Sequence, residues 1–220
     1  MNGILFILIV SAVIAAALFR FADAVRTRGQ WSAATLVRGI TGAALLAYGM
    51  LGFLGAFLSA TGRLPWNADD TPFPMGYVDG AVIDADGLIY CPSPPWGRIQ
   101  LYDRDRRFIR GWFVNAFGGT FRIHVDPENH LQVATARGRM LYVFDRQGRL
   151  LSRASYEPRS YSDFDGWRGS AIAIPTPVYL LPLTHPVFAW ATALAGMLLL
   201  IAHRPARRRR RPELLGTLND

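Results

Sequence analysis

The chain is poor in the side chains that build disulfides and cysteine-based sites. It contains one cysteine, Cys91, and no lysine, so all 24 of its cationic residues are arginines. A single cysteine excludes an internal disulfide, a Cys-x-x-Cys pair and a haem-attachment motif. Cys91 is therefore either a small packed thiol or the point of a cross-link to a second chain.

The sequence also lacks the motifs of common catalytic and metal sites. No Gly-x-Ser-x-Gly nucleophile motif is present, and His124 and His130 have no third ligand or carboxylate base beside them in the sequence. The expected turns hold only one or two carboxylates each, fewer than the roughly six to eight oxygens that calcium requires; these are Asp84, Asp86, Asp126 and Glu128. We therefore expect a protein that is not an enzyme and that holds no metal and no cofactor.

Charge is scarce overall and missing from three long stretches. Only 18% of the residues are charged and 51% are hydrophobic, which is more apolar than an ordinary soluble domain. The charge-free stretches approach the roughly 20 residues that cross a bilayer, and they predict transmembrane helices at residues 1–19, 39–60 and 183–203. A cleaved signal peptide is the alternative for the first, but it has no basic residue before its apolar run.

Two histidines bracket the third stretch. His185 and His203 lie eighteen residues apart, which is five helical turns and therefore one helix face. They are weak candidates for ligating a haem or a chlorophyll-type pigment. Both fall at the expected membrane interfaces, where an ordinary histidine is equally suited.

The arginines predict the topology. Residues 20–38 hold four arginines and one acidic residue, and residues 204–220 hold six arginines and two, whereas residues 61–182 hold fourteen arginines and thirteen acidic residues. The positive-inside rule makes 20–38 a cytoplasmic loop and 204–220 a cytoplasmic tail of a bacterial-type inner membrane protein, with the N-terminus and the middle domain outside, in the periplasm. The arginine run then anchors the third helix and contacts anionic lipid rather than nucleic acid; it comprises Arg207, Arg208, Arg209, Arg210 and Arg211.

The middle of the chain contains an internal repeat of 42 residues. A proline-rich stalk is expected at 61–75. After it, "LYDRDRRFIRGW", which begins at Leu101, corresponds to "YVFDRQGRLLSR", which begins at Tyr142. Alternating apolar residues mark strands in both copies. A period of about 40 to 45 residues is typical of four-stranded propeller blades. The pattern predicts one sheet from strands at 81–84, 88–91, 98–103 and 108–112, a second from strands at 122–125, 130–134, 140–145 and 150–154, and a further strand at 170–174.

The segment "YVFDRQGRLLSR", preceded by "IHVDPENHLQVA", resembles an NHL-type repeat of six-bladed β-propellers. The first copy departs from the second by having Arg106 where the second has Gly148. The resemblance implies a binding platform, here an incomplete ring of two blades. The expected fold class is thus an α+β membrane protein, with three transmembrane helices and an extracytoplasmic all-β domain at 76–182.

Two blades alone share one interface and leave two apolar faces uncovered. An aromatic segment is expected to cover one face or bind a partner; its residues are Tyr156, Tyr161, Phe164 and Trp167. The bilayer, a second copy or another subunit is expected to cover the other face. Such faces normally mark interaction sites.

The expected helices contain no ionisable residue facing a pathway, which argues against a transporter or channel. The second helix instead carries small residues at four-residue spacing, Gly52, Ala56 and Ala60, which let another helix approach closely, in this chain or in a partner. The sequence therefore favours an accessory subunit of a larger integral-membrane complex, respiratory or photosynthetic for example. The alternative is a membrane-anchored sensor that binds a small ligand or a cell-wall component.

Overall fold

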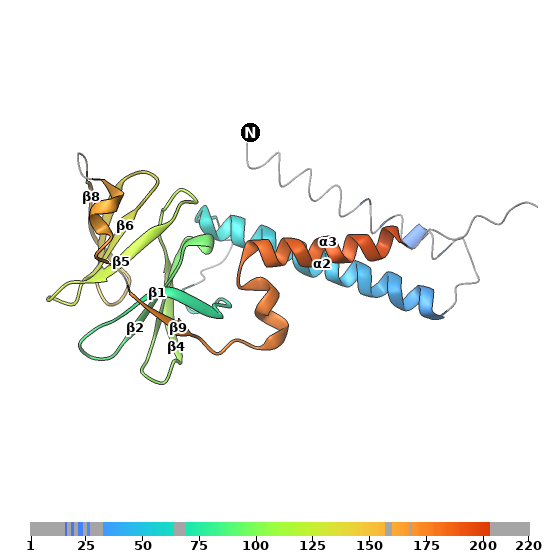
Figure 1. The fold of residues 1–220 in the computed structure, drawn as a ribbon, viewed down its shortest axis with the longest axis horizontal. Helices are drawn as coiled ribbons and strands as arrows, with labels where there is room; N and C mark the ends of the chain where they lie inside the picture. The colour runs from blue at the N-terminus through green and yellow to red at the C-terminus, as the bar shows by residue number, and fades with distance from the viewer. Residues whose placement is uncertain are drawn as a thin grey trace, which may run out of the picture.

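The computed structural model describes residues 33–63, 69–156, 160–167 and 169–202, together with five single positions before residue 33. The helix expected at 1–19, most of the loop at 20–38, His203, and the tail with its arginine run lie outside the described residues. The described part is an α+β structure in which a pair of helices projects from one end of a β-domain (Figure 1). We use "β-domain" for residues 69–174.

The two helices form an antiparallel hairpin. α2 (Ala33–Ala60) packs against α3 (Pro186–Ile201), with Gly42 next to Gly196 and Gly49 next to Ala189. At 1.5 Å per residue they measure about 42 Å and about 24 Å. Among the described residues, α2 alone is long and apolar enough to cross a membrane.

The prediction of three complete spans is therefore not supported by the described helices. α3 has 16 residues, fewer than the roughly 20 that a bilayer needs. Its start is set by proline: residues Val178–Leu183 form the 3₁₀ helix η3, which contains Pro182, and α3 begins only at Pro186. The Nδ1 atom of His185 accepts a hydrogen bond from the Val187 amide at 3.2 Å and caps the new helix.

Two antiparallel sheets confirm the expected β-architecture. The first has the order β4-β3-β2-β1-β9 and the second the order β5-β6-β7-β8. Strand ends differ from the expected ones by at most two residues, except that β1 begins at Tyr77 rather than at residue 81. The bounds are β1 (Tyr77–Ile83), β2 (Ile89–Ser93), β3 (Arg98–Tyr102), β4 (Phe108–Phe113), β9 (Ser170–Ala173), β5 (Phe121–Val125), β6 (Leu131–Thr135), β7 (Met140–Phe144) and β8 (Leu150–Ser155).

The repeat is visible in four equivalent turns. Each has an aspartate whose carboxylate accepts the backbone amide four residues later, at 2.8–2.9 Å, and these aspartates are Asp84, Asp103, Asp126 and Asp145. The residue before that amide donor has a positive φ, which favours glycine or asparagine. Arg106 occupies this position in the second turn with φ 61°, where Gly148 has φ 75°. The departure in sequence thus leaves the turn geometry unchanged.

The shared core lies between the two sheets. It brings together fully buried residues of both, among them Tyr90, Ile99, Ile123, Leu131 and Val133. The outer face of the second sheet is covered by the segment after β8, in which Tyr156 and Phe164 are buried against Ala134. These two aromatics therefore cover a sheet face, which is the first of the two roles expected from the sequence. They are not exposed to a partner, which was the second.

The outer face of the first sheet is covered by the chain itself. Residues 69–75, expected to be part of a free stalk, lie across β3 and β4. The Gln100 side chain makes two hydrogen bonds to the backbone of Phe73, at 2.7 and 3.1 Å, and the Arg98 guanidinium stacks on the Phe73 ring at 4.4 Å. No bilayer or second copy is needed on this face, because Met75 and Ile174 complete its core.

Candidate functional site

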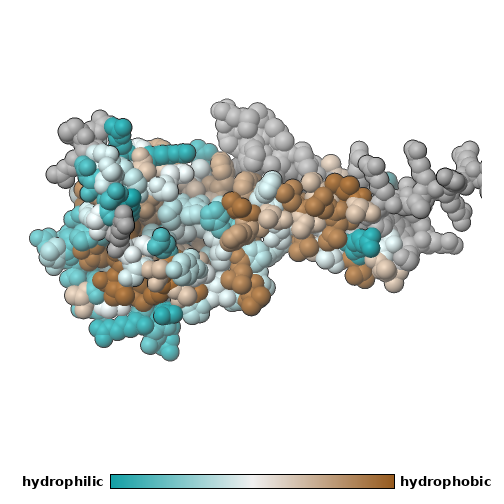
Figure 2. All heavy atoms as spheres, viewed as in Figure 1, coloured by the Kyte–Doolittle hydropathy of each residue, from teal (hydrophilic) through white to brown (hydrophobic). Residues whose placement is uncertain are grey.

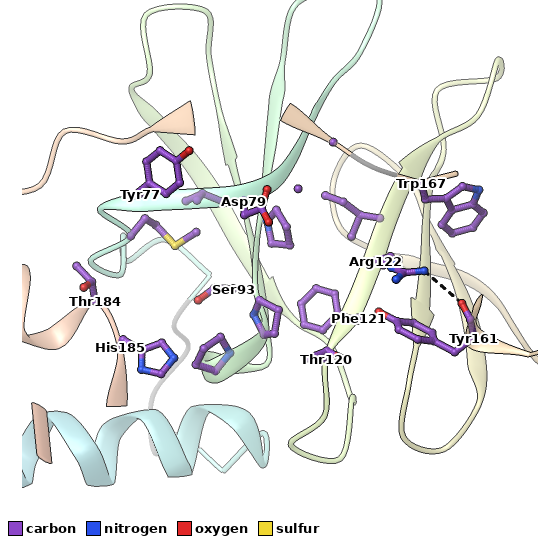
Figure 3. Close-up of a pocket in the computed structure, with 18 residues that line it drawn as sticks. Tyr77, Asp79, Ser93, Thr120, Phe121, Arg122, Tyr161, Trp167, Thr184 and His185 are labelled. Carbon is purple, nitrogen blue, oxygen red and sulfur yellow. Dashed lines mark hydrogen bonds between the residues drawn. The ribbon is translucent and has the colours of Figure 1, made fainter. Parts of the chain in front are cut away.

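A cavity of about 850 Å³ opens where the innermost strands of the two sheets meet, next to the start of α3. Its walls come from β1, residues 92–95 at the end of β2 and just after it, β5, the aromatic cover at 161–169 and the residues before α3. Figure 3 shows its polar side chains, Asp79, Ser93, Arg122 and His185, distributed around the space. Cavities of this size are typical of small-molecule sites.

Arg122 links β5 to the aromatic cover. Its Nη1 forms an ion pair with Asp165 and donates to the Tyr161 carbonyl at 3.3 Å, and its guanidinium lies 4.5 Å from the centre of the Tyr161 ring. Next to it, Trp167 stacks on His124 with ring centres 5.2 Å apart. The wall on this side is therefore rigid and aromatic, and the charge of Arg122 is largely neutralised by its partner.

A second cavity of about 730 Å³ adjoins the first. It is an open, mostly apolar groove between η3, the first turns of α3 and the start of β1, with Val178, Leu181, Phe188 and Ala191 in its walls. Four residues line both cavities: Met75, Tyr77, Thr184 and His185. A polar cavity and an apolar groove thus share one wall at the junction of β-domain and hairpin.

The small-residue ridge of α2 faces the same chain. Gly52 contacts Leu183 and Ala189, Ala56 is buried, and Ala60 lies against Gly97 after the 3₁₀ helix η1 (Pro94–Trp96). The ridge therefore serves packing within this chain. His185, the weak cofactor candidate, caps α3 instead.

Cys91 is completely buried in the core of the first sheet. Burial raises the pKa of its thiol to about 12. In the folded chain it is a packed thiol, and a cross-link to a second chain would require the sheet to open.

A cluster in the β5–β6 turn escaped the sequence reasoning. His130 Nδ1 lies 3.4 Å from an Asp126 oxygen and 3.5 Å from a Glu128 oxygen, and the three could each offer one metal ligand. Asp126, however, already accepts the turn amides of Glu128 and His130, just as Asp84 does in a turn without a histidine. The geometry is that of the repeated turn.

The polar cavity was also missed, because its residues lie far apart in the sequence. Asp79 and Arg122 come from different sheets, and a 42-residue shift aligns neither with a charged residue. Comparison with protein-family models and with curated proteins gives no match. The chemistry of the cavities must therefore be argued from the residues themselves.

Proposed function

We propose that this chain is a non-enzymatic membrane protein whose β-domain lies on the outer face and binds a partner, as an accessory subunit of a larger integral-membrane complex. The observation that carries the membrane part is the outward surface of the hairpin. Large apolar side chains are exposed along it, and Figure 2 shows hydrophobic residues gathered over the helices and η3. They include Ile40, Leu51, Val187, Phe188, Trp190 and Leu198.

α2 has the length and polarity of a membrane-spanning helix, and α3 packs along it. The charge-free part of α2, residues 39–60, measures about 33 Å, close to the roughly 30 Å of a bilayer core. α3 ends beside the start of this part, since Leu199 and Leu200 lie next to Gly42. The sequence beside each of the two helices therefore becomes basic at the end far from the β-domain, which supports a cytoplasmic location for that end. Residues 1–19 would supply a further span.

The proposal that the β-domain binds a partner is supported by the outer edge strand of the second sheet, β8. All six residues of β8 are exposed, including Leu150 and Leu151. An exposed edge strand with apolar side chains is prone to pair with another chain. The NHL-like repeat agrees with this reading, since such blades mostly serve as binding platforms.

A sensor is the second candidate, and the 850 Å³ cavity is the observation that favours it. A ligand there would contact both sheets and the His185 cap of α3, so its binding could change the position of the hairpin. The two candidates differ in which surface carries the function: β8 in the first, and the cavity in the second.

Co-purification from membranes in mild detergent tests the subunit. Leu151→Arg should remove a stoichiometric partner, while Ser152→Arg, the matched control on the opposite face of β8, should retain it. A chain that purifies alone, or loses its partner equally in both variants, would contradict this assignment.

Labelling in intact cells tests the topology. An impermeant maleimide should label Thr61→Cys, at the exposed end of α2, and should not label Thr217→Cys, because the first is expected outside and the second inside. The buried native Cys91 keeps the background low. The reverse labelling pattern would refute the orientation.

A further inference from the structure

We infer that the two adjoining cavities form one binding site for a single membrane phospholipid with a zwitterionic headgroup, its acyl chain in the apolar groove and its headgroup in the polar cavity. The inference rests on the proposed placement of the hairpin in the bilayer. It concerns one specific molecule held at one place, which is distinct from the general contact of the helices with lipid.

The depth of the groove matches an acyl chain. η3 packs against α2 at two positions: the Tyr48 hydroxyl donates to the Tyr179 carbonyl, and Leu183 lies against Gly52. These positions are about two to three turns before the end of α2, near the middle of its apolar part. The groove between η3 and α3 is therefore at a depth that acyl chains occupy, and its exposed walls include Val178, at 80% exposure.

The junction of the cavities matches an amphiphile. An apolar ligand would make no hydrogen bonds to the polar groups of the first cavity, such as Asp79 and Ser93, and a soluble polar ligand would leave the groove exposed to solvent or lipid. A phospholipid fills both, because its headgroup is linked covalently to its chains. The shared residues Thr184 and His185 stand at the position where the two parts of such a molecule join.

The charges of the polar cavity match a zwitterion rather than a simple anion. Asp79 supplies a carboxylate for an ammonium group, and Arg122 shares its charge with Asp165. His185 accepts the Val187 amide through Nδ1, which places its ring proton on Nε2 and leaves a donor for a phosphate oxygen.

The test uses the full chain in bilayer nanodiscs containing a phosphatidylethanolamine with a diazirine on its acyl chain. After illumination, we expect adducts concentrated on residues 178–192. Ala191→Trp fills the groove and should reduce this adduct about tenfold or more. Ala195→Trp, one turn further along the same exposed side of α3 and outside the groove, should leave it unchanged.

Competition tests the headgroup. Unlabelled phosphatidylethanolamine should compete about tenfold better than phosphatidylglycerol, and Asp79→Asn should abolish this preference while the adduct stays in the groove. Equal competition by both lipids in the unmodified chain, or adducts spread evenly along α2 and α3 with no difference between the two tryptophan variants, would overturn the inference.

A separate experiment distinguishes an error in the membrane placement of the hairpin from an error in the lipid site. If alkaline carbonate releases the chain from membranes, the hairpin is not an integral anchor, and the proposed function falls together with the lipid site. If the chain stays in the membrane but gives no groove adduct, the lipid site alone is refuted.

Discussion

The stability of the hairpin depends on the close contact between α2 and α3 at Gly49. The helices approach so closely at Gly49 that a Cβ there would lie 2.4 Å from the Ala189 carbonyl oxygen and 2.4 Å from the Ala193 nitrogen. These are backbone atoms, so no rotamer change relieves the overlap. An ordinary contact needs about 3.5 Å or more, so Gly49→Ala must push the helices apart by about 1 Å.

A control on the same helix isolates this effect. At Gly55 the nearest atom to an added Cβ is 3.8 Å away, on the Trp96 ring, so alanine fits there. Both substitutions replace glycine by a better helix former, which stabilises a helix interior by about 0.5–1 kcal/mol. Forcing extra volume into a packed contact costs about 1–3 kcal/mol. The difference between the two variants therefore reports the helix contact alone.

We expect Gly55→Ala to be as stable as the unmodified chain or slightly more so, and Gly49→Ala to be less stable than Gly55→Ala by about 1–3 kcal/mol, because both gain the same propensity. The assay is thermal unfolding of the full chain in mild detergent, followed by the helical circular-dichroism signal. Equal or higher stability of Gly49→Ala would show that the hairpin is not packed as described.

Three further predictions concern the β-domain. Cys91 should resist maleimide in the folded chain and react fully after unfolding, because burial raises its thiol pKa to about 12; rapid native labelling would contradict its position. Gln100→Leu should lower the free energy of unfolding by about 1–3 kcal/mol, because two part-buried backbone groups of Phe73 lose their partner, whereas the exposed Gln147→Leu should change it by less than about 0.5 kcal/mol. Burial alone would raise the pKa of the Asp145 carboxyl, but its hydrogen bonds to the turn amides and to a guanidinium outweigh this and lower the pKa below 3.8. The contribution of Asp145 to the free energy of unfolding should therefore be present above that pH and decrease on further acidification. Denaturant titration of Asp145→Asn should show a weaker pH dependence.

The strands could be predicted because their signals are local. Alternating apolar residues and aspartate-containing turns lie within a few positions of each other, so each hairpin is specified by its own segment. Arg106 shows the limit of this reasoning. The neighbouring hydrogen bonds of Asp103 hold it at φ 61°, a conformation that arginine does not favour.

The cover of the first sheet could not be predicted from the sequence. A segment with three prolines between residues 65 and 74 favours extended backbone, and nothing local distinguishes a free stalk from a strand-like cover. The position of this segment is decided by Gln100, about 27 positions later, whose fully buried side chain makes two hydrogen bonds to the Phe73 backbone. A buried glutamine in an otherwise apolar strand is the signal that could have pointed to such a cover.

The helices show the same division between local and distant information. Lack of charge located α2 and α3 correctly, but the length of α3 depends on Pro182, Pro186 and the cap at His185, which turn the first part of the apolar stretch into η3. The ridge at Gly52 signalled close packing without naming a partner. The partner proved to be η3 and α3, because the hairpin brings Leu183 and Ala189 to it.

Described segments of this chain pack against both faces of each sheet, although β8 itself stays exposed. Two faces meet in the shared core, residues 69–75 cover the third, and the segment with Tyr156 and Phe164 covers the fourth. Neither sheet fills the space beside β1 and β5. β9 borders one side of that space by pairing with β1, and the cavity of about 850 Å³ opens there toward α3. Among the described residues, this cavity therefore lies at the end of the β-domain where the hairpin begins.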